Sequence, residues 1–147
     1  MSTPTNNQVV DDSTPNLDWS TVGTATAYRV LVDNNNDFSS ITYSVITGST
    51  SQQNNAGPFA DETYFWKVAA RSSVADGFGA NSTVFSFTVD TADPPAPTLI
   101  TPLDNSFTND QTPFFDWNDV SDPGGINRYT LEVATTSSFG ATTVLTQ

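Results

Sequence analysis

The chain of 147 residues carries 16 acidic and 4 basic side chains, giving a formal net charge of -12, and it contains no cysteine or histidine. A field of that sign repels phosphate backbones and anionic lipid, so nucleic-acid binding and membrane docking are disfavoured. The missing residue types exclude disulfides, zinc–thiolate sites and catalysis by Ser-His or Cys-His pairs. No apolar run approaches the roughly 18 residues that suggest a membrane-spanning helix.

Two stretches of the chain repeat each other. Residues 12–19 read DSTPNLDW, and residues 110–117 read DQTPFFDW, 98 positions later. Two further landmarks recur 101 positions later: Tyr28 as Tyr129, and Phe38 as Phe139. Because the landmarks keep their order, with the three extra residues confined to the loop 118–127, the sequence predicts an internal duplication.

Each landmark lies where apolar and polar residues alternate, which predicts half-buried strands. Short strands of this kind, separated by loops containing Gly and Pro, are typical of an all-β sandwich or barrel. The expected inward residues are Trp19, Tyr28, Val30, Tyr64, Trp66, Val68, Phe85 and Phe87 in the first copy, and Phe115, Trp117, Tyr129, Leu131 and Val133 in the second.

A family resemblance rests on three features: Trp19 on the second expected strand, Tyr28 on the third, and the later segment 59–68, FADETYFWKV. Together they resemble the fibronectin type III family. The resemblance implies an immunoglobulin-like antiparallel β-sandwich in which Tyr64 is the corner tyrosine, whose hydroxyl bonds back to the backbone. The tail 85–90, FSFTVD, with its following prolines, is similar to tandem repeats of prokaryotic extracellular and cell-surface proteins.

A period near 98 residues divides the chain into one and a half repeats. We expect a complete fibronectin type III-like domain at 5–91, a Pro-rich linker at 92–97, and the first half of a second repeat, strands A to C′, at 98–147. The absent strands would leave an apolar face uncovered. We therefore expect a neighbouring repeat or an identical chain to complete the half domain, by swapping or by head-to-tail assembly. The alternative is that the half repeat is poorly ordered on its own.

The expected function is a non-catalytic structural spacer or stalk repeat of a large extracellular or cell-surface protein, whose export signal lies outside this segment. Glycoside hydrolysis needs only two carboxylates, but the repeated pair, Asp18 and Asp116, takes outward strand positions beside a core Trp, so an enzyme is not expected. The alternative is an adhesive or carbohydrate-binding module whose partner is a polysaccharide or a cell-surface protein. Its candidate contact residues are Phe65, Phe78 and Phe114.

Acidic residues in the loops are candidate calcium ligands, and no other cofactor is expected. Calcium takes about six to eight oxygen ligands and tolerates varied geometry. The candidates are expected near the junction of the two repeats: Asp33, Asp37, Asp61, Glu62, Asp90, Asp93, Asp119 and Asp122. The alternative is that they are solvated turn carboxylates, because the second copy has ATTSS, without a carboxylate, where the first has DNNND at 33–37.

Overall fold

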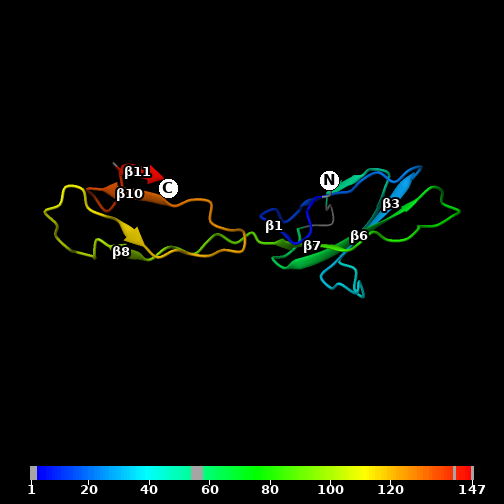
Figure 1. The fold of residues 1–147 in the computed structure, drawn as a ribbon, viewed down its shortest axis with the longest axis horizontal. Helices are drawn as coiled ribbons and strands as arrows, with labels where there is room; N and C mark the ends of the chain where they lie inside the picture. The colour runs from blue at the N-terminus through cyan, green and yellow to red at the C-terminus, as the bar shows by residue number, and fades with distance from the viewer. Residues whose placement is uncertain (1–2, 54–57, 141, 147) are drawn as a thin grey trace. The chain divides into compact units, whose positions relative to one another are not determined.

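A computed structural model describes residues 3–53, 58–140 and 142–146 of the chain. These described residues contain eleven β-strands and no helix, so the predicted all-β class is confirmed. The chain divides into two compact units, unit 1 at Met1–Ala92 and unit 2 at Asp93–Gln147 (Figure 1). Their boundary falls within the Pro-rich segment 92–97, where successive prolines lack the backbone donors that a strand ladder needs.

The described part of unit 1 contains seven strands. They are β1 (Gln8–Val10), β2 (Asn16–Asp18), β3 (Ala27–Asp33), β4 (Tyr43–Thr47), β5 (Ser51–Gln53), β6 (Thr63–Arg71) and β7 (Phe85–Val89). Five of them form one mixed sheet in the order β1-β7-β6-β3-β4, and Figure 1 shows β3, β6 and β7 side by side. The other two, β2 and β5, form an antiparallel ladder, and Thr3 lies beside it through its pairing with Asp18.

The core of unit 1 consists of the apolar rows that alternation predicts. Leu17 of β2 joins the inward rows of β3, β6 and β7 in one buried cluster. Six of the predicted core residues are buried: Tyr28, Val30, Tyr64, Trp66, Val68 and Phe87. The other two, Trp19 and Phe85, are partly buried and pack against the cluster. Alternation therefore predicted the inward face correctly, while the sandwich type stays a prediction.

One strand pairing differs from the antiparallel arrangement that the sequence predicts. β1 runs parallel to β7, with Gln8 opposite Phe87 and Val10 opposite Val89. Alternation shows which face a residue takes, but it does not show which strand will be its neighbour. Most of unit 1 lies between β1 and β7 in the sequence, so no short hairpin imposes the antiparallel direction on this pair.

The hydroxyl group of Tyr64 makes the bond that the family resemblance implies. It accepts a hydrogen bond from the backbone N–H of Ala60 at 3.1 Å. The tyrosine is 2% exposed, and its ring centroid lies 4.5 Å from that of Phe59 and 5.7 Å from that of Phe87. Burial of the phenol and the nearby Glu62 carboxylate raise the pKa of Tyr64 to about 12. The family assignment itself stays a prediction.

The described part of unit 2 contains four strands in two separate antiparallel ladders. One ladder pairs β8 (Leu99–Thr101) with β9 (Asp116–Trp117), and the other pairs β10 (Thr130–Ala134) with β11 (Thr142–Thr146). In chain order these four correspond to the N-terminal strand segment at Thr3 and to β2, β3 and β4 of unit 1. Counterparts of β6 and β7 do not occur among the described residues of unit 2.

The two units reproduce the same aromatic contact. In unit 1 the rings of Trp19 and Tyr28 lie 5.5 Å apart, and the Tyr28 hydroxyl accepts a hydrogen bond from the backbone N–H of Val22 at 3.0 Å. Unit 2 repeats the ring distance of 5.5 Å between Trp117 and Tyr129, and its tyrosine hydroxyl accepts from the Val120 N–H at 3.1 Å. The duplication that the sequence predicts is thus present in the three-dimensional contacts.

The turns repeat as well, and they extend the correspondence towards the N-terminus. Asp12 Oδ1 accepts hydrogen bonds from the backbone and hydroxyl of Thr14, and Asp110 does the same for Thr112. Thr3 pairs with Asp18 as Thr101 pairs with Asp116. The repeated contacts therefore extend to Thr3 in the first copy and to Thr101 in the second, while the domain bounds of 5–91 stay a prediction.

Truncating Trp66 to Ala should lower the free energy of unfolding by about 3–5 kcal/mol, because a large core ring is removed. Trp66 is 4% exposed, whereas Val74 is 77% exposed. The control Val74→Ala should therefore change stability by less than about 0.5 kcal/mol. Urea unfolding measures both variants, and equal losses would contradict the assignment of the inward face.

Stability should fall as the pH rises from about 10 to about 12, owing to Tyr64. Its pKa is 10.0 in the reference state and about 12 in the folded protein, so the unfolded state loses the phenolic proton first. The stabilisation is complete below pH 10.0 and is lost as the pH approaches about 12. Urea unfolding across this range should show a flatter pH dependence for Tyr64→Phe, and an unchanged slope would contradict the assignment.

Candidate interaction sites

The clearest difference between the units is the burial of their inward positions. In unit 1, Leu17, Val30 and Val32 are fully buried, each with 0% exposure. The corresponding positions of unit 2 are Phe115, Leu131 and Val133. Of these, Val133 is 39% exposed and the other two are half-buried. In unit 1 the segment from Phe59 to Val89 also contributes buried residues to the core. The described part of unit 2 has no counterpart of that segment.

A groove of about 300 Å³ lies on this uncovered face of unit 2. Its lining combines the repeated aromatic pair with neighbouring apolar residues: Thr112, Pro113, Phe114, Phe115, Trp117, Tyr129 and Leu131. Phe114, one of the predicted contact residues, is 73% exposed. Phe114 therefore lies on an apolar groove of unit 2. The sequence predicted an uncovered apolar face in this unit, but it did not predict a groove.

The other two predicted contact rings lie in unit 1. Phe65 is half-buried on β6. Phe78 lies in the connection between β6 and β7, where the guanidinium carbons of Arg29 and Arg71 are 5.0 and 4.7 Å from its ring centroid. These cation–π contacts engage the Phe78 ring, which reduces the ring surface that a sugar could stack on. The sequence did not predict that Arg29 and Arg71 contact the Phe78 ring, because an outward position on a strand does not indicate which loop will lie over it.

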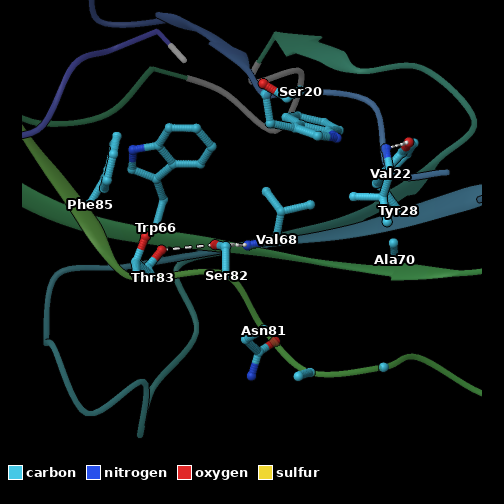
Figure 2. A pocket seen from close by; sticks show the side chains of 13 residues that line it. Ser20, Val22, Tyr28, Trp66, Val68, Ala70, Asn81, Ser82, Thr83 and Phe85 are labelled. Carbon is cyan, nitrogen blue, oxygen red and sulfur yellow. Dashed lines mark hydrogen bonds between the residues drawn. The ribbon is translucent and has the colours of Figure 1, made fainter. Parts of the chain in front are cut away.

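A larger cavity, of about 480 Å³, opens at the edge of the core of unit 1 (Figure 2). Trp66 lines it from β6, and Figure 2 shows this ring projecting beside Phe85. Ser82 is positioned by two hydrogen bonds, accepting from the Val68 N–H at 3.1 Å and donating to the Thr83 carbonyl at 2.8 Å. The remaining lining residues are Trp19, Ser20, Val22, Tyr28, Ala70, Gly79, Ala80 and Asn81.

Two indole groups that line this cavity keep unsatisfied donors. The Nε1 atoms of Trp19 and Trp66 are buried and have no hydrogen-bond partner in the described structure. The rings of Trp66 and Phe85 are perpendicular, with centroids 6.2 Å apart and an interplanar angle of 90°. The cavity has the size of a small-molecule site. Its lining contains no carboxylate and no cationic side chain.

Several predicted calcium ligands accept hydrogen bonds from backbone N–H groups of their own unit. Asp33 is fully buried, and its two carboxylate oxygens accept hydrogen bonds from the N–H groups of Asn35 and Ser40. Three further carboxylates accept from backbone N–H groups: Asp37 from Ser39, Asp61 from Thr91, and Asp122 from Gly124. The remaining candidates are exposed or half-buried: Glu62, Asp90, Asp93 and Asp119.

No group of three or more acidic side chains among the described residues is placed to hold a metal ion. Within each unit, the described calcium candidates do not form such a group, and calcium binding is not tested by this finding. Asp37 is exposed and accepts a turn hydrogen bond, as the alternative of solvated turn carboxylates expects. Asp33 makes turn hydrogen bonds too, but it is buried rather than solvated.

Comparison with the models of known protein families gives no match for this chain, and a search of curated proteins gives none either. The described residues include no helix that is long and apolar enough to cross a membrane. Function must therefore be inferred from the two units themselves.

Chelation should leave the thermal midpoint of the chain unchanged, because the loop carboxylates are already bonded to backbone N–H groups rather than gathered around a cation. The measurement is thermal unfolding with a chelator and then with millimolar calcium, accompanied by calorimetric titration. A midpoint that rises by several degrees with calcium would contradict this expectation.

Proposed function

We propose that this chain is a non-catalytic structural spacer, a repeat segment of a large extracellular or cell-surface protein. The observation that supports this function is the reproduction of one set of contacts in both units. The ring pair, the hydroxyl-to-backbone bond and the Asp–Thr turn all recur. Each of these contacts maintains the fold, and none of them forms a reaction centre.

A partner segment completes unit 2 in this proposal. The free edge of β10 is the position that β6 takes beside β3 in unit 1, where Val30 lies opposite Val68 and Val32 lies opposite Trp66. Among the described residues, β10 pairs only with β11. An open edge beside an uncovered apolar face favours the addition of a strand. The occupant is thus a segment with the alternating apolar pattern of β6 and β7, supplied by a neighbouring repeat or an identical chain.

Extending the chain tests this proposal directly. Residues 48–91, the second half of the first copy, are appended after Gln147, in the order that the repeat prescribes. We expect Leu131 and Val133 to become buried, so their backbone amides should exchange with solvent at least about tenfold more slowly. Binding of a hydrophobic dye should fall at the same time, because the apolar face is covered.

The control extension has the same length but carries Ser at the copied positions of Tyr64, Trp66 and Phe87. It should neither protect β10 nor reduce dye binding, since the inward row can no longer cover the face. Equal amide protection in both extended chains, or in neither, would contradict completion by a segment of this pattern.

The adhesive or carbohydrate-binding alternative is supported by one observation, the exposed Phe114 ring on the groove of unit 2. An aromatic ring beside a groove is a surface on which a sugar can stack. The extended chain separates the two functions, because a segment that covers the groove also removes the sugar-binding surface. Polysaccharide binding that persists in the extended chain would favour adhesion through another surface.

A further inference from the structure

One three-residue motif of unit 1 is not explained by the contacts that the two units share. Asn81-Ser82-Thr83 has the pattern Asn-x-Ser/Thr, which oligosaccharide transferases recognise in exported proteins. No other asparagine of the chain is followed by serine or threonine at the second position. The chain therefore offers a single position to an enzyme of this kind.

The motif lies where the connection between β6 and β7 begins to run beside β6. Asn81 pairs with Ala69 in an isolated bridge, and Phe85 at the start of β7 pairs with Trp66. Between these two pairs, the connection contains one residue more than the facing part of β6, which makes it a β-bulge. A bulge changes the direction in which side chains point, so strand alternation does not decide where the side chains of the motif lie.

The two side chains that a transferase reads are accessible. Asn81 and Thr83 are exposed, and neither the Asn81 amide nor the Thr83 hydroxyl has a hydrogen-bond partner among the described residues. The middle residue is bonded instead, because the Ser82 hydroxyl accepts from the Val68 N–H at 3.1 Å. Figure 2 shows the Asn81 side chain directed away from Trp66. A sugar attached to Asn81 would therefore break no side-chain hydrogen bond of the described fold.

The segment 79–84, which contains the motif, is also an open edge of the sheet. On one side it bonds to the backbone of β6. On the other side, β1 pairs with β7 only from Phe87 onwards, and ahead of β1 the chain crosses to β2, where Thr3 pairs with Asp18. No described backbone group bonds to the outer side of this segment. An unpaired strand edge favours pairing with another chain.

We propose that Asn81 carries an N-linked glycan, which shields this open edge. The donor is a lipid-linked diphospho-oligosaccharide. The Asn81 Nδ2 atom forms a bond to C1 of the first sugar, the bond between C1 and the lipid diphosphate breaks, and the amide gives up one proton to a base of the transferase. Because the glycan is bulky and solubilising, it hinders the approach of a second strand edge.

The inference rests on the proposed extracellular location, since such transferases act on exported chains. The experiment therefore supplies the export itself: the full chain is fused to an export signal and secreted from a eukaryotic cell line that transfers N-glycans. Mass spectrometry should find one glycan, on Asn81, and it should find none on Asn81→Gln or Thr83→Ala. Val84→Ala is the matched control, because it changes the exposed neighbour and leaves the motif intact, so it should keep the glycan. An unmodified secreted wild type would overturn the acceptor site without bearing on the spacer proposal.

Self-association tests the shielding. Sedimentation velocity compares the glycosylated wild type with Asn81→Gln, secreted from the same cells, at equal protein concentration. The fraction of chain in oligomers should be lower for the wild type, and enzymatic removal of its glycan should raise that fraction to the level of the variant. Unit 2 is identical in both proteins, so its open face cannot produce the difference.

Equal association of the glycosylated and glycan-free proteins would overturn the shielding role. A glycosylated wild type with a lower thermal midpoint than Asn81→Gln would overturn the placement itself, because the fold would then not accommodate a sugar at this position.

Discussion

The structure depends on one requirement, that an apolar strand row be covered by a second layer of side chains. In unit 1, Leu17 of β2 and Phe59 join the inward row of the five-stranded sheet in one buried cluster, and β6, which pairs with both β3 and β7, adds Tyr64, Trp66 and Val68 to it. In unit 2 the corresponding rows are present without such a strand, and Val133 remains 39% exposed where Val32 is fully buried. The same local sequence pattern therefore gives a closed core in one unit and an open face in the other.

Local contacts nevertheless form in unit 2 without the covering strands. The Trp117–Tyr129 ring pair and the bond to the Tyr129 hydroxyl join residues close in sequence, so they need no β6. Burial is different, because it requires side chains from a segment far along the chain. Because the ring pair and the turns depend on nearby residues and burial depends on distant ones, the half repeat keeps the geometry of its turns and its ring pair. Its apolar residues stay half-buried or exposed.

Local patterns in the sequence were enough to predict the duplication and the inward rows, since both depend on alternation or on a short motif. The bond made by Tyr64 was expected from the family resemblance instead. Contacts between distant segments were not predictable in the same way. The approach of Phe78 to Arg29 and Arg71 depends on where a long connection folds back over the sheet. The parallel pairing of β1 with β7 is another such contact, because no pattern within either strand specifies its neighbour.

The two copies also differ in the loop that follows β3 in unit 1 and β10 in unit 2. In unit 1, Val32 lies opposite Tyr43, whereas in unit 2 Val133 lies opposite Thr143, so the second connection is one residue shorter. In the longer loop of unit 1, the Asp33 carboxylate accepts hydrogen bonds from the N–H groups of Asn35 and Ser40. The residue of unit 2 that corresponds to Asp33 is Ala134. A buried carboxylate is tolerated only while those bonds satisfy it, so the shorter loop and the missing Asp are two parts of one change. The ring pair and its hydroxyl bond are thus kept between the copies, while the length and the carboxylate of this loop are not.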